Sequence, residues 1–97
     1  MTVARHYIMH AKAGEAAALQ TALENLAVAV RALTGSEGVE MLRYIGNEER
    51  FVFIEKWDSV DSHKAAGGAL PKGMIEKIGA LLDGPPDGSY LDYIKSW

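Results

Sequence analysis

The stretch Phe51-Val52-Phe53-Ile54-Glu55-Lys56-Trp57-Asp58-Ser59 decides the fold class of this chain. Its aromatic and β-branched residues predict a strand over 51–57, with a helix starting at Asp58. Alternate residues of the strand share a face, and both faces are mostly apolar, although Glu55 lies on one and Lys56 on the other. Such a strand is expected to be covered on both sides. Because helices can cover only one face in a domain this small, we expect a second copy of the chain on the other.

The sequence on the N-terminal side of this stretch predicts two more strands and one long helix. Val39–Ile45 is expected to form an antiparallel hairpin with the quoted strand through a polar turn, Gly46–Glu49. Thr2–Ala11 is expected to be the first strand. Between these strands, Glu15–Leu33 carries apolar residues at steps of three and four, which is typical of one helix face. We expect Gly35 to end this helix in a left-handed conformation.

The sequence on the C-terminal side predicts a broken second helix and a last strand. A short helix capped by Asp58 is expected to stop at Gly67-Gly68. Leu70–Leu82 is then expected to be helical, with Pro71 tolerated in its first turn. Ser89–Lys95 carries aromatic and branched residues and is expected to be the last strand.

The predicted order of elements is β-α-β-β-α-β, with the second helix broken. This order is typical of an α+β, ferredoxin-like domain with a four-stranded antiparallel sheet and helices on one face. We expect one such domain over residues 1–97. A pocket is expected between the sheet and the helices.

The composition excludes several classes of function. The chain has 97 residues, of which 48% are hydrophobic and 24% charged, as in globular proteins. Its longest apolar runs are far shorter than the roughly 20 residues that span a membrane, and its N-terminus does not resemble a signal peptide, so we expect a cytoplasmic protein. Its ten Lys and Arg residues are scattered, which argues against nucleic acid as a partner. With no cysteine, thiolate chemistry is excluded.

Several local sequences, together with the order of elements, resemble one known family. They are Lys12-Ala13-Gly14-Glu15, Glu37-Gly38-Val39, the quoted strand-to-helix stretch, and Leu81-Leu82-Asp83-Gly84-Pro85-Pro86. These are similar to the antibiotic biosynthesis monooxygenase family, within the dimeric α/β barrel superfamily. The resemblance implies a homodimer whose sheets pack face to face. It also implies a choice of activities, because the superfamily includes metal-free and flavin-free quinol and polyketide monooxygenases, haem-degrading enzymes, and members without an assigned reaction.

Two departures from the patterns of the superfamily narrow this choice. Members often carry a histidine late in the short helix, where this chain has Ala65-Ala66-Gly67, and its own histidine, His63, lies about one turn earlier. The haem-degrading branch uses an Asn in the first strand, a Trp in the short helix and a His in the next helix. This chain has none of the three, so the resemblance disfavours haem degradation.

His63 and Arg43 are the candidate catalytic residues. A cofactor-free oxygenase must deprotonate a phenol or quinol, which requires a base with a pKa near neutral. The helix phase is expected to direct His63 toward the sheet, where the alternative is that it fills space or bonds a backbone group. Arg43 is a charge within an apolar strand, and it either forms an ion pair with Glu55 or stabilises a phenolate.

The candidate substrate-binding residues are aromatic, with one methionine. They are Trp57, Tyr7, Tyr44, Tyr90 and Met74. The tyrosine hydroxyls could bind a polar substrate oxygen, although most tyrosines in sheets serve packing, and Trp57 could equally anchor the junction between strand and helix.

We assign no metal or cofactor. His6 and His10 share a strand face, but at about 3.3 Å per residue they are about 13 Å apart, which is too far to share a metal ion. The leading hypothesis is therefore a cofactor-independent monooxygenase acting on a quinol or an aromatic polyketide-like small molecule. The alternative is a homodimer that binds a small ligand, or serves a structural role, without turnover.

Overall fold

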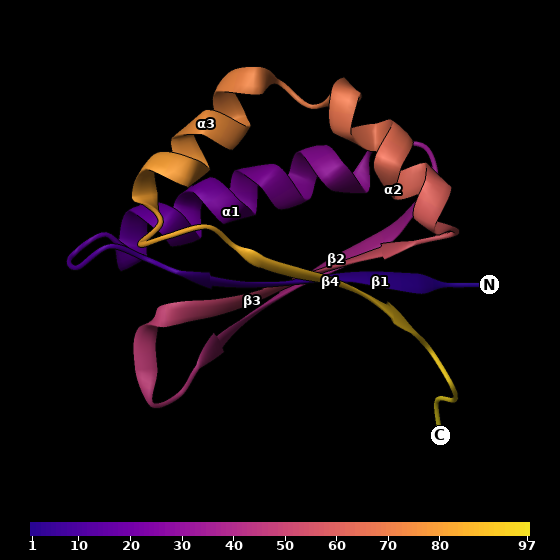
Figure 1. Cartoon of the computed structure of the whole chain (residues 1–97), viewed down its shortest axis with the longest axis horizontal. Coiled ribbons are helices and arrows are strands. Elements are labelled where there is room, and N and C mark those ends of the chain that lie inside the picture. Colours follow the sequence, from indigo (N-terminus) through magenta and orange to yellow (C-terminus); the bar gives the residue numbers. More distant parts are fainter.

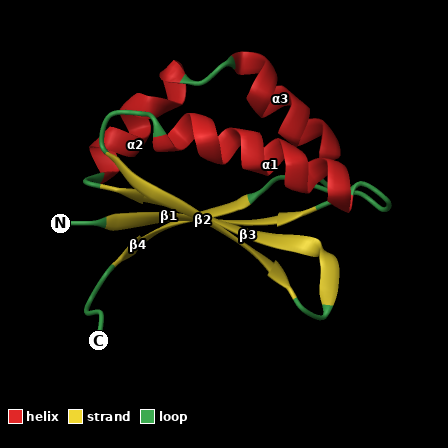
Figure 2. Cartoon of the chain, turned by 180° about the vertical axis from the view of Figure 1, so that it is seen from behind, coloured by secondary structure: helices red, strands yellow, loops and turns green.

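Four antiparallel strands form one sheet in the order β2-β3-β1-β4, and three α-helices lie on one of its faces (Figures 1 and 2). The computed structural model describes residues 1–97. Its elements are β1 (Val3–His10), α1 (Ala16–Arg31), β2 (Ser36–Tyr44), β3 (Asn47–Trp57), α2 (Val60–Ala66), a 3₁₀ turn η1 (Gly67–Ala69), α3 (Lys72–Leu81) and β4 (Asp87–Asp92). The predicted ferredoxin-like order, with its broken second helix, is confirmed.

The sheet places β3 and β1 in its centre, and β2 and β4 at its edges. Register pairs Arg5 with Glu55 across β1 and β3, and Arg5 with Tyr90 across β1 and β4. Because side chains alternate along a strand, all three of these residues lie on the same face of the sheet. By the same rule, His6 and His10 share one face of β1, as expected, while Tyr7 and Met9 lie on the other face, which is the helix side.

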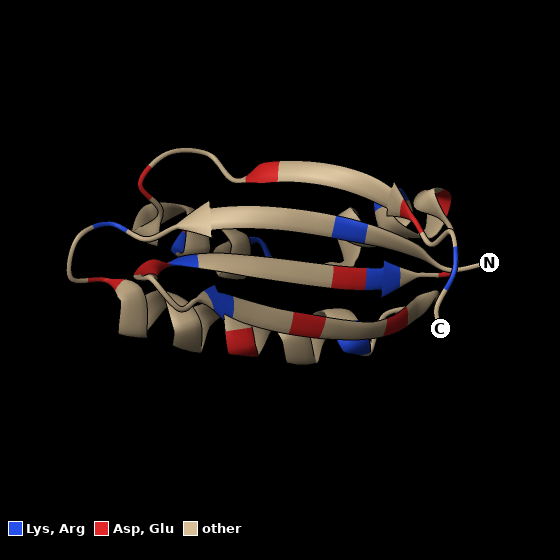
Figure 3. Ribbon diagram, turned by 90° about the horizontal axis from the view of Figure 1, so that it is seen from below, with Lys and Arg blue, Asp and Glu red and all other residues tan.

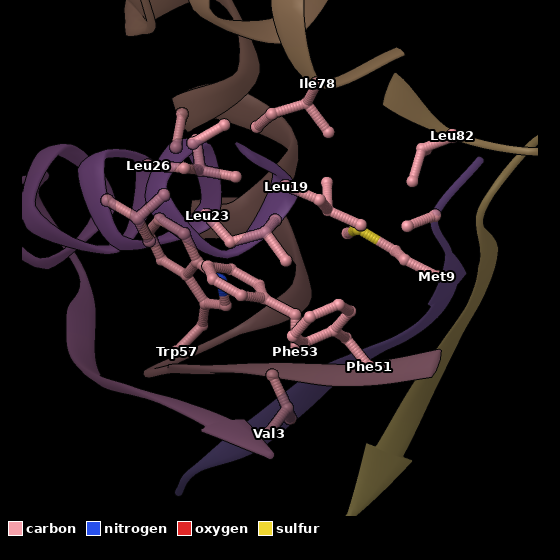
Figure 4. Packing of buried hydrophobic residues seen from close by; sticks show 14 residues of the cluster. Val3, Met9, Leu19, Leu23, Leu26, Phe51, Phe53, Trp57, Ile78 and Leu82 are labelled. Carbon is pink, nitrogen blue, oxygen red and sulfur yellow. The ribbon is translucent and has the colours of Figure 1, made fainter. Parts of the chain in front are cut away.

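The core lies between α1 and the helix side of the sheet. α1 buries its apolar stripe of Leu19, Leu23, Leu26 and Val30 together with Ala22. These side chains pack against the aromatic residues of β3, Phe51, Phe53 and Trp57, each of which is at most 1% exposed (Figure 4). Burying one large apolar side chain contributes about 1.5–3 kcal/mol, so this layer fixes α1 on the sheet and holds the end of β3 in place.

Several predicted boundaries were wrong by a few residues, and the differences have local causes. The turn between β2 and β3 is Ile45-Gly46, so β3 already begins at Asn47 rather than after Glu49. The N-cap of α2 is Ser59, whose hydroxyl accepts a hydrogen bond from the Ser62 amide at 3.1 Å.

The remaining differences concern the predicted capping and end residues. Asp58, the predicted cap, instead accepts a hydrogen bond from the Ser62 hydroxyl. Pro71 lies before α3 rather than in its first turn, and β4 ends at Asp92. Gly35 is left-handed, with φ +87°, as expected, but it lies in the turn into β2, beyond the C-cap residue Ala32.

The other face of the sheet has no helix on it. Figure 3 shows the sheet from this side, with the strands in front of the helices. Among the residues on this face are Ile8, Val52 and Ile54, which are half-buried, and Leu42 and Leu91, which are exposed. The chain after β4 curves away on this side (Figure 1). None of the helices is both long and apolar enough to cross a membrane.

Candidate functional site

A cavity of about 400 Å³ lies between the helices and the sheet. Of the 14 residues that line it, ten are hydrophobic, and they come from β1, α1, β3, α2 and α3 and the segments around them. Its polar or amphipathic lining residues include Tyr7, Glu55, Trp57 and His63. The cavity therefore combines an apolar interior with a small group of titratable side chains, which is the usual composition of a small-molecule site.

His63 lies in the first turn of α2 and points toward the sheet. The Ser59 cap fixes where the helix starts, and His63 is the fourth helical residue. Its Nε2 atom is 3.2 Å from the Tyr7 hydroxyl, and its Nδ1 atom is 2.6 Å from the Tyr90 hydroxyl. We refer to Tyr7, His63 and Tyr90 as the tyrosine–histidine cluster. It joins α2 to β1 and to the edge strand β4.

Glu55 is the one charged residue in the buried interior, with 5% of its surface exposed. Its Oε1 atom accepts a hydrogen bond of 3.0 Å from the indole Nε1 of Trp57 and lies 3.7 Å from His63 Nε2. Burial raises the pKa of Glu55, and the hydrogen bond from Trp57 and the positive charge of Arg5 oppose that rise only in part. The carboxyl is therefore biased toward its neutral form.

The two other titratable groups on the cavity wall are also biased toward neutral forms. Burial, followed by the charges of Arg5 and Lys64, lowers the pKa of His63. Burial raises the pKa of Tyr7. The contact between Glu55 and His63 is thus better described as one between a carboxyl and a neutral imidazole than as an ion pair. A neutral imidazole donates from one nitrogen and accepts at the other, which suits it to pass a proton between the two tyrosines.

Arg5 completes the polar end of the site. The centre of its guanidinium lies 4.9 Å from the centroid of the Tyr7 ring and 4.3 Å from that of Tyr90. The same two tyrosines that bond His63 therefore also stack against this cation.

The structure brings together four of the seven candidate residues. His63, Tyr7 and Trp57 line the cavity. Tyr90 joins them through its contact with His63. The ring of His63 also packs edge-on against the rings of Trp57 and Tyr90, with centroid distances of 5.7 Å and 5.3 Å.

The other three candidates lie elsewhere. Arg43 is exposed near the end of β2, where its Nη1 is 3.4 Å from Gln20 Oε1, so the expected ion pair with Glu55 is not formed within the chain. The ring of Tyr44 packs under Arg50 at 4.8 Å, away from the cavity. Met74 lines a separate hollow of about 220 Å³ beside residues of α1.

Sequence reasoning did not identify Glu55 and Arg5 as site residues. Glu55 had a visible signal, since it is a carboxylate on the aromatic face of an otherwise apolar strand. Arg5 had none, because its position between two tyrosines depends on the pairing of β1 with β4, which the sequence does not specify. No cluster of three or more metal-ligating side chains occurs in the structure.

Comparisons with known proteins identify relatives by sequence and by fold. The family model described as "Antibiotic biosynthesis monooxygenase" matches residues 2–68. No curated protein matches the sequence significantly.

Three solved structures illustrate the likeness in fold. A Bordetella bronchiseptica protein provisionally named as an antibiotic biosynthesis monooxygenase is 17% identical, with a TM-score of 0.86, and 97% of this chain aligns with 98% of that one. SnoaB, a cofactor-independent oxygenase from Streptomyces nogalater, is 16% identical, with a TM-score of 0.85 over 98% and 95% of the two chains. Rv0793 from Mycobacterium tuberculosis is 17% identical, with a TM-score of 0.81 over 99% and 98%. At these identities the likeness establishes the fold.

Proposed function

This chain belongs to the antibiotic biosynthesis monooxygenase family, and on that premise we propose that it is a cofactor-independent monooxygenase acting on a quinol or an aromatic polyketide-like small molecule. The observation that carries the proposal is the position of His63, a histidine with a lowered pKa on the wall of an apolar cavity and in contact with two tyrosine hydroxyls. The name of the structural neighbour SnoaB supports the same class of reaction.

The size and lining of the cavity suit such a substrate. Its volume of about 400 Å³ lies within the usual range for ligand pockets, about 300–1,000 Å³. The apolar wall, with Leu26, Val30 and Leu70 among its residues, would contact the ring system. Trp57 and Tyr7 would bind the substrate at the polar end, where a phenolic hydroxyl could reach the tyrosine–histidine cluster.

The proposed reaction begins with removal of a proton from that hydroxyl. His63 accepts the proton at Nε2, either directly or through the Tyr7 hydroxyl, and can release a proton from Nδ1 to Tyr90, which is 38% exposed. The resulting anion is electron-rich enough to reduce dioxygen itself. One oxygen atom enters a ring C–H position, the other leaves as water, and the quinol is oxidised to a hydroxyquinone. Substrate and dioxygen therefore balance product and water without an added reductant.

The position of the remaining candidates gives them no direct part in this scheme. Arg43 contacts Gln20, Tyr44 stacks on Arg50, and Met74 lines a separate hollow. Glu55 is placed to act through its neighbours, because it holds the Trp57 indole and lies beside His63 Nε2.

The proposal includes a homodimer in the cytoplasm. The sheet face opposite the helices carries Ile8, Val52, Ile54, Leu42 and Leu91 with no element over them. Apolar patches of this kind usually mark an interface. A second copy that packs sheet to sheet would cover this face and produce the dimeric α/β barrel that is typical of the family.

A homodimer that binds a ligand without turnover is the rival function. It is favoured by one observation, namely that both ring nitrogens of His63 already have hydrogen-bond partners within the chain. The two functions differ in whether dioxygen is consumed, because the monooxygenase uses it to form product and the ligand-binding homodimer does not.

The test is incubation of the protein with a panel of hydroquinones and anthrone-like compounds, in air and under anaerobic conditions. The proposal predicts a product that forms only in air and is lost in His63→Ala. Binding of panel members with no oxygen-dependent product would instead support the rival.

A further inference from the structure

Arg5 has no ion-pair partner within the chain. Carboxylate oxygens lie within 4.0 Å of His10, Lys56, His63 and Lys72, but none lies within that distance of the Arg5 guanidinium. Its Nε atom is enclosed and has no hydrogen-bond partner. Buried polar nitrogens usually have a hydrogen-bond partner, so this enclosed and unpaired Nε needs an explanation.

The fold holds this guanidinium in a fixed place. Its stacking between the rings of Tyr7 and Tyr90 limits its motion from both sides. Gly88 of β4, which lies opposite Tyr7 in the register, provides the space. A Cβ atom at Gly88 would collide with the guanidinium and lie 3.1 Å from the Tyr7 ring. The site is therefore built from three positions on two strands.

The titratable groups around Arg5 are biased toward their neutral forms. Burial biases Glu55, its partner across β1 and β3, toward the neutral carboxyl, and biases Tyr7 toward the neutral phenol. His63 is biased toward the neutral imidazole, in part by Arg5 itself. Lys64, the remaining charge that acts on His63, is also positive. The guanidinium of Arg5 therefore has no ion-pair partner, and it lies against Tyr7 at the polar end of the cavity.

We propose that Arg5 binds a carboxylate on the ligand, so that the preferred ligands are acidic hydroxyaromatic compounds. Tyr7 both lines the cavity and stacks on Arg5, so a ligand ring that contacts Tyr7 places a neighbouring substituent beside the guanidinium. A planar carboxylate matches the fork of N–H donors on arginine. A hydroxyl next to the carboxylate would then face the Tyr7–His63 pair. As a statement about the substrate, this inference rests on the proposed function. The binding of the carboxylate to Arg5 can be tested without turnover.

The test is a comparison of two ligands that differ only in the acid group, hydroxynaphthoate and naphthol. Binding is followed by quenching of Trp57 fluorescence in a Trp97→Phe background, since Trp57 lines the cavity and Trp97 is exposed. The protein with Arg5 intact should bind hydroxynaphthoate at least about tenfold more tightly than naphthol, as one charge-assisted contact would give. If the protein with Arg5 intact binds the two ligands with equal affinity, the proposal is overturned before any substitution is made.

Substitutions then assign the preference to Arg5. Arg5→Gln should bring the two affinities together by weakening hydroxynaphthoate binding only, and Gly88→Ala should do the same by displacing the guanidinium. Arg50→Gln is the matched control, because Arg50 also stacks on a tyrosine and also has an enclosed, unpaired Nε, but its tyrosine, Tyr44, does not line the cavity as Tyr7 does. A similar loss in Arg50→Gln, or equal weakening of both ligands in Arg5→Gln, would contradict the proposal.

The two proposals fail in different ways. If neutral quinols are oxidised but the acid preference is absent, only the assignment of Arg5 is wrong. If the acid preference depends on Arg5 but no ligand is oxidised, the anion site stands and the oxygenase does not.

Discussion

His63 and Tyr90 lie 27 residues apart in the sequence, yet the imidazole Nδ1 and the phenol oxygen are 2.6 Å apart. The contact connects α2 to the edge strand β4, while the other ring nitrogen reaches Tyr7 in β1. An imidazole held on both sides has a defined orientation, and its proton can move only toward one tyrosine or the other. The proposed function depends on this arrangement.

Removal of the Tyr90 hydroxyl should slow turnover without preventing binding. In Tyr90→Phe, His63 Nδ1 loses its partner, and a lost hydrogen bond of about 0.5–1.5 kcal/mol corresponds to a decrease in kcat of roughly 2- to 12-fold. KM for a quinol substrate should change little. Tyr93→Phe is the control, because Tyr93 lies beyond β4 and its hydroxyl makes no hydrogen bond to a side chain. Steady-state kinetics that show the same loss in both variants would argue against the relay.

The activity should depend on pH through His63. Because burial and the nearby positive charges lower its pKa, the base is neutral at pH 7, and kcat/KM should fall only below the ordinary histidine pKa of 6.5. At pH values below this pKa, kcat/KM should decrease by close to tenfold for each pH unit. A substrate that does not titrate between pH 5 and 8, about the window in which histidine does, is the right probe. A midpoint above 6.5 would exclude His63 as the base in the free protein.

Glu55→Gln should stabilise the protein at neutral pH but not at acidic pH. A raised pKa means that the folded state keeps its proton while the unfolded state loses it, so the stabilising contribution is complete below about pH 4.5 and is lost as the pH rises through the raised value. Glutamine retains an oxygen that can accept from Trp57 Nε1 and cannot ionise.

This effect can be measured as a difference in Tm between Glu55→Gln and wild type. The difference should be small near pH 4.5 and grow as the pH rises toward 8, because burial raises the pKa of Glu55. Glu24→Gln, at an exposed position of α1, controls for the loss of one negative charge. All samples need the same protomer concentration. A difference that does not vary with pH would contradict the assignment.

A charge on the open face of the sheet should separate the proposed dimer. Ile54 lies in the central strand β3 on the face opposite the helices, so Ile54→Lys would place an unpaired ammonium in the interface. Sedimentation velocity at micromolar concentration should show wild type at twice the chain mass and the variant at the chain mass. Val28→Lys, at a position of α1 that is 74% exposed, should remain dimeric. A monomeric wild type would refute the dimer.

The sequence was sufficient for the fold because its signals were local. The leucine repeat of α1 and the alternation of β3 each follow from the periodicity of one element, so the element order and the two faces of β3 were predicted correctly. Element ends were less accurate, because a cap or a turn depends on single contacts, such as that between Ser59 and Ser62.

The site was only partly predictable because it is assembled from four separate segments. His63, Tyr7, Trp57 and Tyr90 were selected for their chemistry, and the fold places them together. Arg43 was selected as a charge within an apolar strand, but it lies near the exposed end of an edge strand. The role of Arg5 follows from the register of β1 against β4, and that register depends on long-range pairing.

The central claim is that His63 starts an oxygen insertion that needs no cofactor. The most direct test is single-turnover oxidation of a hydroquinone under isotopically labelled dioxygen, with mass spectrometry of the product. The proposal predicts one labelled oxygen atom in the quinone product and the other in water, with incorporation lost in His63→Ala. A product without label, or equal incorporation in His63→Ala, would contradict it.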